Sequence, residues 1–273
     1  MVVQHNLSAM NTSRQLNGVT GALSKSTEKL SSGYRINRAG DDAAGLTISE
    51  KMRSQIRGLD KASTNAQDGI SAIQTAEGAL NEAHAILQRM NELATQAAND
   101  TNTSSDRTAI SKEMTSLQTE LDRIAETTQF NTMNLLSGSF TGKNLQVGAL
   151  KGQTIEISIG AMDSTTLGIG TADLIKVDSN ANAGATMSRV QAAISKVSTQ
   201  RSALGAIQNR LEHTIKNLDT TSENTSAAES RIRDVDMAKE MVTYSKNNIL
   251  AQAGQSMLAQ ANQSNQGVLS LLQ

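Results

Sequence analysis

A run of apolar and small residues, at alternating spacings of three and four, lies between Leu59 and Ala97 and constrains the fold more than any other stretch. This alternation is the a/d pattern of a helix that packs along a seam against other helices. At about 1.5 Å of rise per residue, one helix over this stretch would be roughly 60 Å long. Ala and Gly at many seam positions would let a partner approach closely. The seam positions are Leu59, Ala62, Ala66, Gly69, Ile73, Ala76, Leu80, Ala83, Leu87, Met90, Ala94 and Ala97.

Two later stretches repeat the helical spacing and are the expected partners of this seam. The polar turn at 99–106 would end the long helix, predicted over 44–98, and cap a second helix over 105–128 that folds back antiparallel. A third helix, over 185–228, carries a second seam with Arg201 and Gln208 as polar inserts, which cost stability but fix register. The apolar positions of these two helices are Ile110, Met114, Leu117, Leu121 and Ile124, then Met187, Val190, Ile194, Val197, Leu204, Leu211, Ile215 and Leu218.

Between these helices, residues 131–180 change in character. Glycines divide short runs, and Ile155, Ile157 and Ile159 alternate with polar residues at period two, which predicts a small set of β-hairpins. The two ends of the chain, 1–43 and 230–273, are weakly apolar helical stretches that need partners. The predicted fold class is therefore mainly α: a long antiparallel coiled-coil rod domain over 44–229, a β-hairpin region, and paired terminal helices.

Composition excludes several classes of function. The chain has no Pro, no Cys and no Trp, so burial must come from narrow aliphatic seams, and a disulfide framework or Cys-ligated metal is excluded. The net charge of −1 gives no footprint for binding nucleic acid. No stretch approaches the ~20 apolar residues of a membrane span, and the first residues lack the pattern of a cleavable secretory signal. We therefore expect no membrane insertion, and any export would use another route.

The sequence offers no chemistry of an enzyme. His5, His84 and His213 lie on different predicted helices, and none has a second ligand at metal-binding spacing. Phosphate loops, nucleophile elbows and dinucleotide fingerprints are missing from the sequence, and no carboxylate pair stands out as a general acid and base. We predict no catalytic residue, no metal site and no cofactor.

Motifs at both ends resemble those of the bacterial flagellins. LSSGYRIN at 30–37 and DDAAGL at 41–46 resemble the N-terminal signature, and SRIRDVDMAKE at 230–240 with NILAQA and MLAQAN after it resembles the C-terminal one. QDGIS, EGAL and TQFN at 67–71, 77–80 and 128–131 extend the resemblance over nearly the whole helical part.

The resemblance implies a structural subunit that polymerises into the extracellular flagellar filament for motility. In this family the paired termini form the inner filament core and the central segment lies outside. It also implies unfolded export through the flagellar type III apparatus, an export chaperone on the C-terminal helix, and junction and cap proteins at the filament ends. The family's large outer domains are not expected, because only 131–184 separates the helical halves. Carried over to this sequence, the filament core residues are Leu7, Met10, Leu23, Leu30, Val242, Ile249, Met257, Leu258, Val268 and Leu272.

Two further sets of residues follow from the resemblance. The connection between the domains would involve Arg35, Ile36, Asn37, Asp41, Asp42, Arg231 and Asp234. Recognition of the monomer by Toll-like receptor 5 would involve Arg89, Leu93 and Glu113. By heptad phase Arg89 and Leu93 lie off the seam and are candidates for the surface. The alternative is that Leu93 packs on the second helix and Arg89 forms an exposed ion pair.

Two other functions remain open from sequence. One is a minor filament-related protein, such as the junction component between hook and filament. The other is a soluble coiled-coil signalling module that forms no polymer.

Overall fold

The computed structural model describes residues 6–171 and 173–270, with side chains described as far as residue 263. The chain is mainly α-helical with two short antiparallel strand pairs, which confirms the predicted fold class. The helices are α1 (Leu7–Ser32), α2 (Ala43–Ala97), α3 (Ser104–Thr127), α4 (Ser164–Leu167), α5 (Asn180–Arg233) and α6 (Met237–Ser270), and the strands are β1 (Gln129–Phe130), β2 (Met133–Asn134), β3 (Lys143–Gln146) and β4 (Thr154–Ile157).

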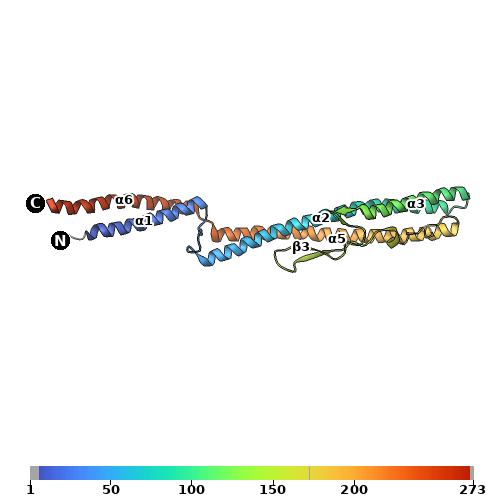
Figure 1. The fold of residues 1–273 in the computed structure, drawn as a ribbon, viewed down its shortest axis with the longest axis horizontal. Coiled ribbons are helices and arrows are strands. Elements are labelled where there is room, and N and C mark those ends of the chain that lie inside the picture. The colour runs from blue at the N-terminus through green and yellow to red at the C-terminus, as the bar shows by residue number, and fades with distance from the viewer. Residues whose placement is uncertain (1–5, 172, 271–273) are drawn as a thin grey trace. The chain divides into compact units, whose positions relative to one another are not determined.

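The chain divides into two compact units, and the boundaries between them fall inside α2 and α5. Within the described residues, the terminal unit holds the chain up to Gln55 and from Glu223 onward, and the central unit holds Ile56–Ser222. The sequence-based division lies nearby, at 43/44 and 229/230. In the terminal unit α1 and α6 run antiparallel side by side, and in the central unit α3 and α5 lie along α2 (Figure 1).

The core of the central unit is the predicted seam. All twelve seam positions of α2 are buried, as are Ile110, Met114 and Leu121 of α3. On α5 the smaller Ala183, Thr186 and Ala193 are buried, and the buried Val and Leu side chains recur every seven residues, as expected for one half of a heptad seam. These Val and Leu positions are Val190, Val197, Leu204, Leu211 and Leu218. The predicted pairing of the helices through their seams is thus confirmed.

The polar inserts of α5 lie at the edge of this core. The Arg201 guanidinium is 3.7 Å from the Glu77 carboxylate of α2, and the Gln208 amide donates to Glu212 on its own helix. Two further polar pairs join the helices in register, since Ser63 donates to Asp219 and Ser222 donates to Asp60. Such pairs fix which residues of α2 and α5 face each other.

Glycines on α2 admit the β3–β4 hairpin. A Cβ placed on Gly69 would lie 2.2 Å from Leu145 Cδ1, and one on Gly58 would lie 2.9 Å from Ala149 Cβ. The Asn65 amide donates to the Gln146 carbonyl at 3.1 Å and holds the hairpin at the same place. At Gly69 the hairpin is therefore a closer neighbour than a helix, whereas the sequence pattern predicted a helix there.

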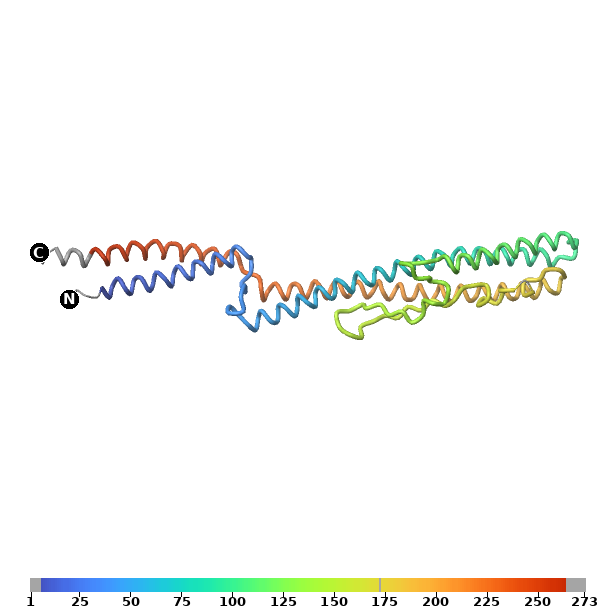
Figure 2. The backbone as a smooth tube through the Cα atoms, in the orientation of Figure 1, coloured from blue at the N-terminus to red at the C-terminus, as the bar shows by residue number. Residues whose placement is uncertain are grey.

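The β region has less strand than its sequence predicted. β3 pairs with β4 from Lys143↔Ile157 to Gln146↔Thr154, and the alternating Ile155, Ile157 and Ile159 are buried, as their period indicated. Apart from the two-residue pairing of β1 with β2, the remainder is loop and the single-turn helix α4, which Gly168 ends in the left-handed conformation at φ 89°. Figure 2 shows this segment following α3 and leading back into α5.

Candidate functional site

The C-terminal helix α6 is apolar on more sides than one partner can cover. Its α1-facing side includes Ala251, which is buried. At about 100° per residue, Val242 and Ile249 lie on the opposite side of the helix, and they are 70% and 66% exposed. A helix with apolar residues all round is typical of one buried between several partners. The exposed apolar residues of α6 are Met237, Met241, Val242, Ile249, Leu250 and Met257.

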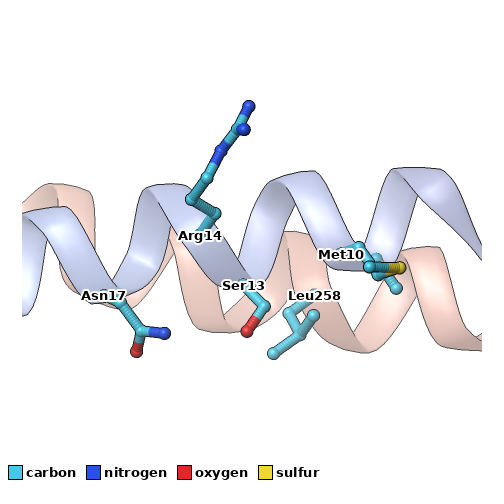
Figure 3. Close-up of a pocket in the computed structure, with 6 residues that line it drawn as sticks. Met10, Ser13, Arg14, Asn17 and Leu258 are labelled. Atoms are coloured by element: carbon cyan, nitrogen blue, oxygen red, sulfur yellow. The ribbon is translucent and has the colours of Figure 1, made fainter.

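The N-terminal helix α1 contributes to the same surface. Leu7 and Met10, in its first turns, are strongly exposed. Met10 lines a shallow groove of about 510 Å³ with Leu258 of α6. The polar Ser13 and Asn17 also line the groove, and Figure 3 shows Ser13 next to Leu258. We call this groove and the exposed apolar residues of α1 and α6 the apolar terminal surface.

Polar contacts at both ends and one close packing contact join α1 and α6, which lie side by side. The Asn6 amide, which also caps α1, donates to the Ala261 carbonyl at 2.9 Å, and Lys29 lies 3.9 Å from Glu240. Leu16 packs against Gly254, where a Cβ would lie 3.2 Å from Leu16 Cδ1.

The predicted filament-core residues fall into three groups. Leu7, Met10, Val242, Ile249 and Met257 are exposed in the terminal unit. Leu23, Leu30 and Leu258 are half-buried there. Val268 lies in α6 but its side chain is outside the described residues, and Leu272 is outside them altogether.

The segment between α1 and α2 meets the one between α5 and α6. Arg35 N–H donates to the Arg233 carbonyl at 2.7 Å, and Val235 N–H donates to the Gly33 carbonyl at 3.0 Å. Tyr34 pairs with Asp234 in an isolated β-bridge, and the Arg233 guanidinium lies 4.6 Å from the centre of the Tyr34 ring. The Arg35 side chain adds a hydrogen bond to the Ile232 carbonyl. The two chain ends are thus tied together by backbone and cation–π contacts.

The other predicted connection residues shape the turn before α2. Ile36 is buried, and the Asp41 carboxylate accepts the N–H groups of Asn37 and Arg38, which lowers the pKa of Asp41 below its ordinary value. Asp42 accepts the Gly45 N–H at 2.8 Å and so caps α2. Arg231 is exposed in the last turn of α5.

The predicted receptor residues split between surface and core. The Arg89 guanidinium donates to Glu113 of α3 at 3.0 Å and to Glu92 at 3.1 Å, and these bonds raise the pKa of Arg89. Its side chain remains 50% exposed. Leu93 is only 2% exposed. The surface position considered for Leu93 is therefore wrong: it packs in the core shared with α3, and Arg89 forms the exposed ion pair of the alternative interpretation.

The described residues offer no other site of evident chemistry. They contain no group of three or more potential metal-binding side chains. His84 places its Nε2 3.0 Å from the Gln88 amide nitrogen of the next turn. None of the described helices has both the length and the apolarity that crossing a membrane requires.

The fold and the apolar terminal surface define a class of protein, a helical structural subunit. Its central unit has a buried core, and its terminal helices leave apolar residues exposed. The family models for the bacterial flagellin N-terminal and C-terminal helical regions match residues 3–141 and 187–272. The chain belongs to the bacterial flagellin family. It is a structural subunit of the flagellar filament and not an enzyme.

Relatives agree over the full length. A flagellin from Halalkalibacterium halodurans is 56% identical, and one from Bacillus subtilis is 51% identical, with both chains covered completely in each case. The solved structure of Bacillus cereus flagellin is 32% identical with a TM-score of 0.50, over 61% of this chain and 94% of that one. A putative flagellar hook-associated protein from Vibrio parahaemolyticus shares the fold, with a TM-score of 0.61 over 71% of this chain and all of that one, at 14% identity.

Sequence reasoning missed several residues of these surfaces. Met237, Met241 and Leu250 are exposed apolar residues of α6 that a single-faced helix pattern did not single out. A count of apolar residues around the whole circumference of α6 would have found them. The Tyr34–Arg233 contact carries no signal in the sequence, because the two residues are brought together only by the fold.

Proposed function

We propose that the apolar terminal surface is where copies of this chain meet, and that 1–43 with 230–273 forms the inner core of the filament while 44–229 forms the surrounding rod domain. The observation that carries this is the exposure of Val242 and Ile249 on the side of α6 that faces away from α1. Exposed apolar residues in such number are typical of an interaction surface. A surface that binds a different surface of the next copy, and so does not close, makes an open filament.

Seeded growth tests this proposal. Purified subunits are mixed with short filament seeds, and elongation is followed by electron microscopy. Ile249→Asp is expected to reduce elongation strongly, since it buries a charge at the contact. Gln191→Asp, at an exposed polar position of α5 outside the apolar terminal surface, is expected to change elongation little. Equal elongation by both variants would contradict the assignment of the surface.

A deletion separates assembly from folding of the central unit. Removal of residues 238–273 takes away nearly all of α6 and leaves Ile56–Ser222 intact. The truncated chain should keep the cooperative unfolding of the central unit by circular dichroism and fail to elongate seeds. Loss of both would show that the two units fold as one.

The same surface supports an export route. Before assembly, exposed Met, Val and Ile side chains on α6 would be a liability for aggregation, and an export chaperone that covers α6 would remove it. Unfolded passage through the flagellar type III apparatus suits a chain without disulfides, and junction and cap proteins would bind at the filament ends. Co-purification of a cytoplasmic chaperone with the full chain, but not with the 238–273 deletion, is the expected result. Equal capture by both would place the chaperone elsewhere.

For recognition by Toll-like receptor 5, the exposed ion pair Arg89–Glu113 is the contact. Leu93 is buried and stabilises the packing of α2 beneath this ion pair. Arg89→Ala and Glu113→Ala should each weaken binding of the monomer to the receptor ectodomain. Arg123→Ala, which breaks an exposed ion pair with Glu120 elsewhere on α3, is the matched control. Binding by Arg89→Ala as tight as that of the parent would remove these residues from the contact.

The alternative of a junction protein has one observation in its favour, the fold shared with the Vibrio hook-associated protein. At 14% identity that likeness concerns the fold alone, whereas the flagellins from Halalkalibacterium halodurans and Bacillus subtilis match at half or more of all positions. A junction protein would bind filament ends at one or two layers and stop. A soluble signalling module would form no polymer at all. Continuous growth on seeds distinguishes the filament subunit from both.

A further inference from the structure

The methionines of the two units differ in burial. In the central unit Met90 and Met114 are fully buried, Met162 is nearly so and Met187 is half-buried, with Met133 as the exposed exception. In the terminal unit none of the described methionines is buried. Four of them are exposed at large apolar positions, and they are Met10, Met237, Met241 and Met257.

We propose that these four thioethers are sites of reversible oxidation that switch the free subunit between assembly-competent and assembly-blocked forms. The inference rests on the proposed function, because it takes the apolar terminal surface as the contact between copies. The oxidant is a peroxide. A lone pair of the thioether sulfur attacks one peroxide oxygen, the S–O bond forms as the O–O bond breaks, and the departing oxygen takes up the proton. Sulfur loses two electrons, and hydrogen peroxide is reduced to water. The return step uses a dithiol as reductant: it gives up two electrons and two protons and becomes a disulfide, the S–O bond breaks, and the oxygen leaves as water.

Oxidation changes the property that the surface depends on. A methionine sulfoxide is polar and a strong hydrogen-bond acceptor, whereas the thioether is apolar and adapts its shape to a partner. Met10 lines the groove with Leu258, so a sulfoxide there puts a polar oxygen among the side chains of both terminal helices (Figure 3). Met237 and Met241 are one helical turn apart on α6, and two sulfoxides would alter one continuous patch. Burial of such groups without a hydrogen-bond partner opposes association.

In the folded subunit, burial protects the core methionines of the central unit and leaves those of the apolar terminal surface accessible to the oxidant. Exposure decides which methionines react, so Met90 and Met114 are protected in the core of the central unit. The chain has no cysteine to consume the oxidant first. A methionine on the apolar terminal surface is accessible in the free subunit and would be covered in the filament, so the switch acts before assembly.

The test compares three forms of the full chain: the parent, the fourfold variant Met10→Leu, Met237→Leu, Met241→Leu and Met257→Leu, and the control Met133→Leu. Leucine keeps the apolar volume and cannot be oxidised. Each is treated with hydrogen peroxide, the sulfoxides are located by peptide mass spectrometry, and elongation of untreated seeds is measured. A portion of treated parent is then reduced with methionine sulfoxide reductases.

We expect treated parent and treated Met133→Leu to elongate at least about tenfold more slowly than untreated protein. The reductases restore the parent, and the treated fourfold variant keeps its untreated rate. Equal elongation by treated and untreated parent, with the four sulfoxides present, would overturn the inference. If the fourfold variant elongates seeds slowly even before treatment, the test is whether the reductases restore elongation by the treated parent. Failure to restore it would overturn the inference. Failure of untreated parent to elongate seeds would contradict the proposed function and this inference with it.

Discussion

The terminal and central units use similar amphipathic helices in different ways. In the central unit every seam position of α2 is buried against the rest of the unit. In the terminal unit the large apolar residues of α6 are mostly exposed. The buried residues of that unit, among those whose side chains are described, are Ser26, Ile36, Gly45, Ser49 and Ala251. The central unit therefore completes its core within one chain. The terminal unit leaves apolar residues exposed, and under the proposed function other copies of the chain in the filament cover them.

The largest expected effect is on the free energy of unfolding when a buried side chain of the central unit is truncated. Leu80→Ala removes a fully buried side chain of the central core and should lower the free energy of unfolding by about 3 kcal/mol. Ile249→Ala truncates a comparably large side chain of α6 that is mostly exposed, and should change it by less than about 0.5 kcal/mol. Urea unfolding of the unassembled subunit, followed by circular dichroism, measures both. Similar losses would mean that α6 is already packed in the free subunit.

A smaller effect sharpens the account of the central unit, where the β3–β4 hairpin lies against α2. A Cβ added at Gly78 of α2 would meet no atom within 4 Å, so Gly78→Ala should stabilise by about 1 kcal/mol through helix propensity alone. At Gly58 the added Cβ would lie 2.9 Å from Ala149 Cβ and 3.3 Å from its Cα, so Gly58→Ala should lose that gain. The midpoints of urea unfolding give the difference. Equal stabilisation would show that the hairpin is not seated at Gly58.

The smallest expected effect is a loss of stability at low pH, and it should occur in both units. Thr103 donates to Asp106 in the capping box of α3, and backbone N–H groups donate to Asp41 before α2, so both carboxyl pKa values lie below the ordinary 3.8. A carboxyl whose pKa is lowered by folding stabilises the folded state above the ordinary value, and this contribution is lost as pH falls through the lowered pKa. The melting temperature should therefore fall as the pH drops below about 4, and Asp106→Asn should flatten part of that fall. An unchanged slope in Asp106→Asn would show that its cap does not contribute.

Sequence reasoning predicted the central unit better than the terminal one, for a physical reason. A heptad seam buried within one chain leaves a period of three and four in the sequence, and α2, α3 and α5 follow it. The sequence did not predict that the β3–β4 hairpin lies against Gly69, because a glycine in a helix seam can have either a strand or a helix as its close neighbour. The buried position of Leu93 was left open because a heptad marks only two of seven positions, and a helix with two neighbours buries more. On α6 the apolar residues are spread around the helix instead of forming one stripe, so no single period describes them.

Amide hydrogen exchange in the free subunit and in the filament tests the central claim most directly, that the central unit is complete alone and the terminal unit is completed by other copies. Helices with few buried contacts open at low free-energy cost and exchange quickly. We predict slow exchange for the seam of α2, around Leu80 and Leu87, in both states. For α6 from Met241 to Met257 we predict fast exchange in the free subunit and slow exchange in the filament. Equal protection of α6 in the two states would contradict the account.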